Sequence, residues 1–275
     1  MTAAQAQGSL DVNGGSGRHA SDWNSKLYLK FEAERTRAAR DLLARVPYCE
    51  TRLVFDLGCG PGNSTELLAS SFPGAAIVGI DTSDNMLDVA RARVPGASFV
   101  NADIGDWRPP EGADVIFANA SLHFLADHRS AITWLLHALR PGGRLAVQMP
   151  NNTHEPSHAA MRMVAADGPW ASRLLPIAKS LTVVGQAEEY YDLLAPLCRK
   201  VDIWQTVYVH PLDGAGDVVE WFAGSGLRPF LDLLTPAETD EFLARYRERL
   251  AQAYPGRPNG KVLLRYPRIF FVLQK

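Results

Sequence analysis

The sequence predicts an α/β fold: a doubly wound, mostly parallel sheet of seven strands, with a helical cap inserted late in the chain. Two observations lead to this fold. Short apolar runs alternate with helical patterns from residue 53 to residue 149, and the connections between them are short. The alternation stops after Pro150, where long helical segments precede and separate two more strands. Strands that alternate with helices form parallel sheets covered on both faces, and right-handed crossovers make such sheets doubly wound.

The first half of the chain accounts for five of the strands. Each expected strand is a short apolar run, and each expected helix carries apolar residues at helical spacing. The expected strands are residues 53–55, 76–80, 97–100, 113–117 and 144–149. The expected helices are residues 26–46, 64–71, 83–93 and 128–139. Asn63 is the expected N-cap of the second helix, and Pro141-Gly142-Gly143 ends the fourth.

The second half of the chain contains the segments that are expected to complete the sheet. Residues 151–197, 217–227 and 236–254 have mainly helical patterns, whereas residues 201–210 and 262–273 read as strands. Pro267 indicates a bulge or an edge position in the last strand, because proline cannot donate to the ladder. A strand pair that comes after helices predicts that the sheet is completed beyond a helical insertion, which could roof a site.

These patterns predict one ordered domain with a leader before it. The domain spans residues 21–275, with its core sheet at about 48–150, 198–212 and 260–275. The helical substrate cap is expected at about 151–197 and 213–259. Residues 1–20 are rich in Gly, Ser, Ala and Gln, which is flexible-linker chemistry, and we expect them to form a disordered leader.

Composition and charge exclude several classes of function. A hydrophobic fraction of 47% is that of a globular protein, and a formal net charge of −2 argues against a general nucleic-acid binder. No stretch approaches the ~20 apolar residues of a membrane span, and no signal peptide is visible. Cys49, Cys59 and Cys198 fit neither a disulfide framework nor a zinc spacing. We therefore expect a cytoplasmic protein with no metal, no nucleic acid, no membrane and no obligate protein partner.

Four expected strands end in residues that suit ligand binding. In open parallel sheets, ligands bind beyond the carboxyl ends of the strands. The first strand leads into Asp56-Leu57-Gly58-Cys59-Gly60-Pro61-Gly62, where glycine allows close backbone approach and the next helix N-terminus favours a negative group. Asp81 ends the second strand and could accept both hydroxyls of a ribose, and Asp103 follows the third and could accept from an adenine amino group. Residues 119–123, Asn-Ala-Ser-Leu-His, follow the fourth.

A tight turn without a ligand is the plainer interpretation of these glycines. Asp81 could likewise only cap the helix that follows it. However, Ser83 and Asp84 already supply caps there, and acidic residues stand at two successive strand ends. A ligand site is therefore the stronger interpretation.

Taken in order, these segments resemble the signatures of class I S-adenosylmethionine-dependent methyltransferases, which have a Rossmann-like fold. The segments that carry this resemblance are residues 54–62, 79–81, 102–103 and 139–143. Further segments are similar to the narrower family of trans-aconitate 2-methyltransferases, namely residues 21–24, 114–122, 147–150, 201–204 and 226–229. This narrower resemblance extends from residue 21 to the last strand and leaves the leader outside it.

The resemblance implies S-adenosylmethionine as cofactor and S-adenosylhomocysteine as its product. It implies that Asp56, Gly58 and Gly60 cradle the methionine part. Asp81 would hold the ribose, Asp103 and Ile104 would read the adenine, and Asn119 and Ser121 would lie near the methyl group. The full set of expected cofactor-binding residues is Asp56, Gly58, Gly60, Asn63, Asp81, Thr82, Met86, Asp103, Ile104, Asn119 and Ser121.

The resemblance also implies an enzyme that transfers the methyl group to a carboxylate of trans-aconitate and releases the monomethyl ester. A carboxylate is already ionised at neutral pH, so no acid–base residue is required, although a catalytic role for His123 stays open. Holding a polyanion calls for arginine, whose planar fork suits carboxylates. Arg228 is the leading anchor because Pro229 stiffens the chain after it. Arg35, Arg37, Arg265 and Arg268 are weaker candidates, because each could equally be solvated. The expected substrate-binding residues are Trp23, Tyr28, His123, Trp221, Arg228 and Tyr266.

Other functions stay open as alternatives. The same fold could methylate another small carboxylic acid or another small molecule, or could bind the cofactor without catalysis. A nicotinamide-dependent oxidoreductase would favour G-x-G-x-x-G, but here the third glycine comes one residue too early. Residues 154–158 match the zinc-protease pattern H-E-x-x-H. We treat that match as coincidental, because Pro156 prefers the first helical turn and leaves His154 before the helix.

Overall fold

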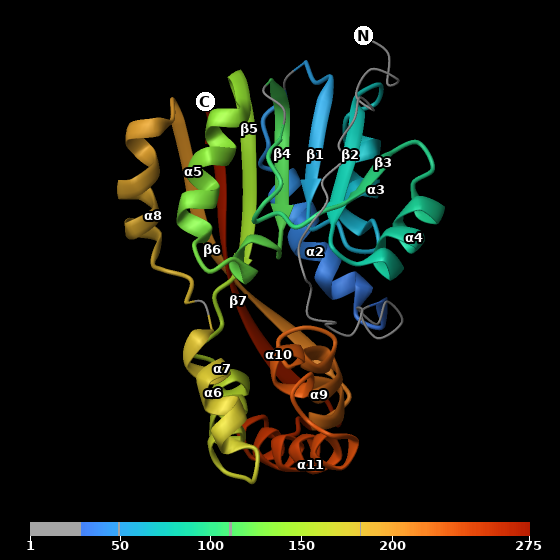
Figure 1. The fold of residues 1–275 in the computed structure, drawn as a ribbon, viewed down its shortest axis with the longest axis vertical. Helices are drawn as coiled ribbons and strands as arrows, with labels where there is room; N and C mark the ends of the chain where they lie inside the picture. Colours follow the sequence, from blue (N-terminus) through green and yellow to red (C-terminus); the bar gives the residue numbers. More distant parts are fainter. Residues whose placement is uncertain (1–28, 49, 110–111, 182) are drawn as a thin grey trace.

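A single mixed sheet organises the computed structural model, which describes residues 29–48, 50–109, 112–181 and 183–275. Within these residues the sheet has seven strands in the order β3-β2-β1-β4-β5-β7-β6 (Figure 1). Neighbouring strands from β3 to β5 run parallel, whereas β7 runs antiparallel to both β5 and β6. The predicted fold class is therefore confirmed.

The elements follow the predicted alternation closely. The strands are β1 Leu53–Leu57, β2 Ala76–Asp81, β3 Ser98–Asn101, β4 Ala113–Asn119, β5 Leu139–Pro150, β6 Lys200–Leu212 and β7 Val262–Gln274. The α-helices are α2 Glu32–Leu43, α3 Asn63–Ser71, α4 Asp84–Arg93, α5 His128–Ala138, α6 Pro156–Ala166, α7 Ala171–Ser180, α8 Ala187–Leu194, α9 Ala215–Ala223, α10 Arg228–Leu231 and α11 Pro236–Ala253. Two short 3₁₀ helices are η2 Leu122–Phe124 and η3 Ala195–Leu197.

Helices cover both faces of the parallel part of the sheet. Helices α2, α3 and α4 lie on one face, and α5 and α8 lie on the other (Figure 1). The alternation of strand side chains explains this arrangement: Val54 joins the core shared with α2 and α3, whereas Phe55 and Leu57 join the core shared with α5 and α8. Each face of β1 is thus buried against a different helical layer.

Five helices, which we call the cap helices (α6, α7, α9, α10 and α11), gather beyond the carboxyl ends of the parallel strands (Figure 1). Strands β6 and β7, each 13 residues long, reach from the sheet to these helices. Phe31 of the segment before α2 and Trp221 of α9 belong to one continuous hydrophobic core, with ring centroids 5.1 Å apart. The cap helices therefore share a core with the sheet.

Helix α8 lies apart from the cap helices, although residues 151–197 were expected to form one part of the cap. Tyr190 and Leu194 of α8 are fully buried against the sheet, and the ring centroid of Tyr190 is 4.7 Å from that of Phe271 in β7. The reason is the apolar face of α8, which covers the part of the sheet beside α5. The cap segment therefore ends before α8.

One further expectation differs from the structure in detail. Helix α3 begins at Asn63, and its N-cap is Gly62 with φ +88°, so Asn63 is not the cap. Pro267 forms no bulge but occupies the expected edge position: it pairs with β6 only, and the pairing of β7 with β5 begins at the next residue, Arg268, opposite Pro150. The leader, Trp23 and Tyr28 lie outside the described residues. No helix in the described ranges is both long and apolar enough to span a membrane.

Candidate active site

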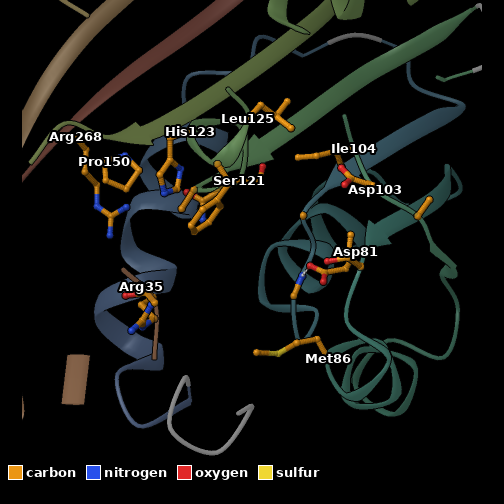
Figure 2. A pocket seen from close by; sticks show the side chains of 18 of the residues that line it. Arg35, Asp81, Met86, Asp103, Ile104, Ser121, His123, Leu125, Pro150 and Arg268 are labelled. Atoms are coloured by element: carbon orange, nitrogen blue, oxygen red, sulfur yellow. Dashed lines mark hydrogen bonds between the residues drawn. The ribbon is translucent and has the colours of Figure 1, made fainter. Parts of the chain in front are cut away.

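A cavity of about 340 Å³ lies at the carboxyl ends of the parallel strands (Figure 2). It is bordered by the ends of β1, β2 and β4, by α2, by β7 and by the segment between α9 and α10. Its lining residues are Arg35, Gly58, Gly60, Asp81, Thr82, Met86, Ala102, Asp103, Ile104, Asn119, Ala120, Ser121, His123, Phe124, Leu125, Pro150, Ser225, Tyr266 and Arg268. Most of the residues expected to bind the cofactor therefore border one space.

Figure 2 shows that the two sides of this cavity differ in charge. Asp81 and Asp103 lie on one side, with Met86 and Ile104 beside them; we call this side the acidic wall. Arg35, Tyr266 and Arg268 form the other side, which we call the basic wall; Figure 2 shows the two arginines on this side, with His123 near Arg268.

Asp81 ties two backbone segments of the acidic wall together. Its Oδ2 accepts from the N–H of Gly60 at 2.9 Å, and its Oδ1 accepts from the N–H of Ser83 at 3.0 Å. Asp103, after β3, accepts from the N–H of Gly105 through Oδ1 at 2.7 Å. Each carboxylate is thus oriented by backbone donors, and each oxygen retains a lone pair for a further hydrogen bond.

The two glycines after β1 serve different purposes. Gly58 has φ +67°, and a Cβ there would lie 2.3 Å from the Cβ of Ser121, so glycine lets the ends of β1 and β4 approach each other. Gly60 has φ +53°, but a Cβ there would meet nothing within 4 Å. Since Gly60 borders the cavity, the open space beside it is room for a ligand.

Strained backbone and an unsatisfied amide mark the end of β4. Ala120 adopts φ +56°, a conformation that is uncommon outside glycine and that clusters at functional sites. Ser121 donates to the carbonyl of Leu57 at 2.6 Å. The buried Oδ1 of Asn119 accepts no hydrogen bond from any residue that the structure describes. This oxygen is therefore suited to accept from a ligand in the cavity.

The basic wall combines arginine with aromatic rings. The Arg268 side chain donates from Nη1 to Oε1 of Gln148 at 3.0 Å, and its guanidinium lies 4.5 Å from the ring centroid of Tyr266. The Arg35 side chain donates from Nη2 to the carbonyl of Trp221 at 2.9 Å and lies 4.8 Å from the Trp221 ring centroid. Both guanidinium groups are thus oriented by neutral groups at the edge of the cavity.

His123, from η2, faces the cavity from the same side as Arg268 (Figure 2). Burial, and then the nearby charge of Arg268, lower its pKa to about 3. The imidazole is therefore neutral at physiological pH and cannot provide a positive charge for an anion. Because the protonated form of His123 has so low a pKa, the neutral imidazole is also a weak base.

Two residues expected at the cofactor lie away from the cavity. The Asp56 carboxylate is fully buried and accepts from the hydroxyls of Ser64 and Thr65 at 2.8 and 2.6 Å. Burial raises its pKa to about 6. Asp56 thus holds α3 against β1, since strand alternation points its side chain toward that helix.

The other displaced residue, Asn63, contributes to helix packing. Its side-chain amide donates to Oε1 of Glu32 at 2.9 Å and to Oγ1 of Thr36 at 3.0 Å. These two bonds connect α3 with α2. Because Asn63 is inside the helix rather than at its cap, its side chain points across to the neighbouring helix.

Some of the residues expected to bind the substrate border the cavity, and others do not. Tyr266 and His123 border the cavity, whereas Trp221 is fully buried behind it, with its ring centroid 5.4 Å from that of Tyr266. Arg228 is not among the lining residues; it is the first residue of α10, a short helix that packs against α7. The stiffness that Pro229 provides does not bring Arg228 to the cavity.

The four arginines that were weaker candidates for substrate binding also differ in whether they border the cavity. Arg35 and Arg268 border the cavity. Arg37 lies over the ring of Tyr208, 5.1 Å from its centroid, and Arg265 pairs with Glu155 at 3.8 Å. The structure therefore brings two of the weaker candidates to the cavity and leaves the leading candidate, Arg228, outside it. Sequence reasoning also missed Pro150 at the end of β5, Phe124 and Leu125 at the end of η2, and Ser225 between α9 and α10, which all border the cavity.

The described residues contain no group of three or more His, Cys, Asp or Glu side chains that could hold a metal ion. The H-E-x-x-H pattern is broken in space as well, because α6 begins at Pro156 and His154 precedes it.

Comparisons with known proteins show which family this chain is similar to. A family model for methyltransferase domains matches residues 54–143. The chain is 51% identical over 255 residues to a trans-aconitate 2-methyltransferase of Rhodopseudomonas palustris (strain BisB5), a match that covers 93% of this chain and 100% of that protein. It is 52% identical over 255 residues to a trans-aconitate 2-methyltransferase of Afipia carboxidovorans, with 93% of this chain and 100% of that protein covered.

Solved structures show the same fold at lower identity. The YcgJ protein of Bacillus subtilis superposes with a TM-score of 0.57 at 12% identity, covering 87% of this chain and 98% of that chain. Haemonchus contortus phosphoethanolamine N-methyltransferase 2, solved with phosphomonomethylethanolamine and S-adenosylhomocysteine, superposes with a TM-score of 0.51 at 16% identity. That match covers 86% of this chain and 52% of the other.

Proposed function

This chain belongs to the family of trans-aconitate 2-methyltransferases, and we propose that the cavity between the acidic and basic walls is its active site. The enzyme transfers the methyl group of S-adenosylmethionine to a carboxylate of trans-aconitate, giving the monomethyl ester and S-adenosylhomocysteine. The observation that carries our assignment of the site is its division by charge. A cationic cofactor and an anionic acid need opposite surroundings, and one cavity offers both.

The acidic wall fits the cofactor. The open space beside Gly60 leaves room for it, and the unsatisfied Oδ1 of Asn119 can accept from its ammonium group. We assign the ribose hydroxyls to Asp81 and the adenine amino group to Asp103. Met86 and Ile104 supply the apolar contacts that a flat purine needs.

Thr82, Gly58 and Ser121 also border this space and complete the proposed cofactor site. Ser121 already donates its hydroxyl to the Leu57 carbonyl, so it shapes the loop and presents its remaining lone pairs. Asp56 is assigned a supporting role behind the loop.

When bound against Asp81, Asp103 and Asn119, the cofactor would supply an electrophilic methyl group on a positively charged sulfur, and the sulfur would keep the electron pair of the bond that the carboxylate replaces. No proton moves, because the carboxylate is already ionised. The protein's task is to align the two partners and exclude water, which can lower a barrier by up to roughly 7–11 kcal/mol.

Two features of the cavity agree with a mechanism without acid–base catalysis. His123 is neutral and weakly basic, so it can orient a substrate by hydrogen bonding without taking up a proton. Phe124, Leu125 and Pro150 give the cavity apolar edges that displace water near the reacting atoms.

The substrate and the free thiols support our proposals for the partners and the compartment of the enzyme. The substrate is a small polycarboxylate, so no macromolecular partner is needed for turnover. Cys59 and Cys198 are free thiols among the described residues, and we keep the cytoplasm as the expected compartment.

The test is methyl transfer from labelled cofactor to a panel of small carboxylic acids, together with Asp81→Asn. This substitution keeps the size of the side chain but removes the charge that strengthens its bonds to the ribose. We expect cofactor affinity to fall at least about tenfold, measured by calorimetry. Asp88→Asn is the matched control, because Asp88 lies on the exposed face of α4.

Two outcomes would overturn the proposal. Unchanged cofactor affinity in Asp81→Asn would move the ribose away from the acidic wall. Transfer of label to a different acid in clear preference to trans-aconitate would favour another methyltransferase of this fold, and binding without any transfer would favour a non-catalytic protein.

A further inference from the structure

We propose that Arg268 makes this site selective for acids with several carboxylates, by holding a carboxylate that is not methylated, and that Arg35 holds a second one. The proposal rests on the proposed function, because it assigns the substrate end of the same cavity. It replaces Arg228, the sequence-based candidate, by two arginines that border the cavity.

The position of Arg268 follows from the register of β7. Tyr266 and Arg268 are two residues apart in one strand, so their side chains leave the same face. Arg268 lies opposite Pro150, the last residue of β5, and Pro150 itself borders the cavity. The guanidinium therefore reaches the point where the sheet opens into the ligand space, as Figure 2 shows.

Two neutral groups, the Gln148 amide and the Tyr266 ring, orient the guanidinium of Arg268. The residue is only 4% exposed, and a buried guanidinium is unfavourable unless its donors are satisfied. Its Nη1 bond goes to Gln148, which is fully buried and whose amide is neutral. The ring of Tyr266 adds a cation–π contact. A fixed cation beside a cavity is a preorganised carboxylate site, because a bidentate pair can form without reorganisation.

Arg35 provides the second cation from a different element. It is held at the cavity by the carbonyl and ring of Trp221, and Figure 2 shows it apart from Arg268 on the same side. The opposite side of the cavity carries Asp81 and Asp103, which repel carboxylates. A tricarboxylate can therefore satisfy this arrangement with two carboxylates on the arginines, while its third carboxylate faces the middle of the cavity, where the methyl group is delivered.

Substitution of Arg268 gives the test. Arg268→Gln removes the charge and the planar fork, and we expect the KM for trans-aconitate to rise about ten- to hundredfold. We expect cofactor affinity to stay within about twofold. Dicarboxylic analogues such as itaconate lack one of the anionic groups, so the preference of the enzyme for trans-aconitate over itaconate should shrink by a similar factor.

Gln148→Glu is a second variant that leaves Arg268 in place. The change is isosteric, but the new carboxylate would pair with the guanidinium and neutralise it. We expect the same rise in KM for trans-aconitate with little change in cofactor affinity. Arg265→Gln is the matched control, because Arg265 is in the same strand but its side chain is 61% exposed, and we expect wild-type kinetics from it.

The position of the ester provides an independent readout. If Arg268 fixes the orientation of the acid, the product of Arg268→Gln should contain a mixture of monomethyl esters, visible by NMR. Unaltered kinetics and a single ester in both Arg268→Gln and Gln148→Glu would overturn the inference. That result would leave the proposed function standing, whereas failure of the wild-type enzyme to methylate any acid would reject the proposed function itself.

Discussion

The two walls of the cavity are assembled from different kinds of chain segment. The acidic wall comes from residues 58–104, where successive strand ends supply Gly60, Asp81 and Asp103 in chain order. The basic wall joins Arg35 of α2 to Tyr266 and Arg268 of β7, which are separated by almost the whole chain. A cofactor shared by a large family can be bound by local, repeated geometry, whereas a particular acid requires contacts that only the completed fold provides.

The walls also differ in how they shift the pKa of nearby groups. Behind the acidic wall, burial raises the pKa of Asp56 to about 6, and the charge of Asp81 adds to this rise. Behind the basic wall, burial lowers the pKa of His210 to about 4, and the charges of Arg268, Arg37 and Arg35 add to this fall. Each wall therefore concentrates charge of one sign. This charge favours the neutral form of a nearby group that would carry the same sign, namely the Asp56 carboxyl and the His210 imidazole.

The largest expected effect is loss of stability in acid, and it comes from two buried histidines. His158 and His210 are both buried, with pKa values lowered to about 4, below the value of about 6.5 in an unfolded chain. The unfolded chain then binds more protons, so stability falls as the pH drops from about 6.5 to 4. Each histidine can account for up to about 3 kcal/mol of this loss.

His158→Met should make that acid loss shallower, as measured by urea denaturation at pH 7, 5.5 and 4.5. His137→Asn is the control, since His137 is exposed on α5. Asp56 acts in the opposite direction: its raised pKa contributes stability below about pH 4 that is lost as the pH rises through about 6, so Asp56→Asn should steepen the acid loss. Equal slopes in all four proteins would contradict the opposite contributions assigned to His158 and Asp56.

A smaller effect is expected at the acidic wall from Gly60→Ala. Gly60 and Gly74 both have positive φ and open space where a Cβ would be, but only Gly60 borders the cavity. Alanine should strain the backbone by about 1–2 kcal/mol at either position. Only Gly60→Ala should also weaken cofactor binding, by about tenfold or more, because its methyl group enters the space assigned to the ligand. Equal cofactor affinity in the two variants would place the cofactor elsewhere.

The smallest effect is expected from Arg228→Lys. Arg228 does not border the cavity, so the kinetics with trans-aconitate should stay within about twofold of the wild-type values. A tenfold loss of affinity for the acid would restore Arg228 as the anchor and would remove the basic wall from substrate recognition.

The sequence predicted the acidic wall well because its residues follow strand ends that hydrophobic runs identify. Asp56 does not border the cavity, and a signal for this was present: it alternates with Phe55 and Leu57, so its side chain lies on the face covered by α3. Asn63 does not border the cavity either, because the helix begins one residue earlier than its polar pattern suggested, with Gly62 as the N-cap.

The basic wall could not be ranked from sequence, because burial of an arginine depends on tertiary neighbours. Arg265 and Arg268 lie in the same strand, yet Arg265 is exposed and Arg268 is buried beside Gln148. That contact requires β7 to insert between β5 and β6, a strand order that hydrophobic periodicity does not reveal. A spacing of two from Tyr266 was the available signal, since both side chains then leave the same face of the strand.

The central claim is that one cavity binds the cofactor on its acidic wall and the acid on its basic wall. A crystal structure of the enzyme with S-adenosylhomocysteine and trans-aconitate tests it most directly. We expect the adenosine against Asp81 and Asp103, two carboxylates within hydrogen-bond distance of Arg268 and Arg35, and the third carboxylate facing the cofactor sulfur. An acid bound at Arg228, or bound in the cavity without contact to Arg268, would contradict the account.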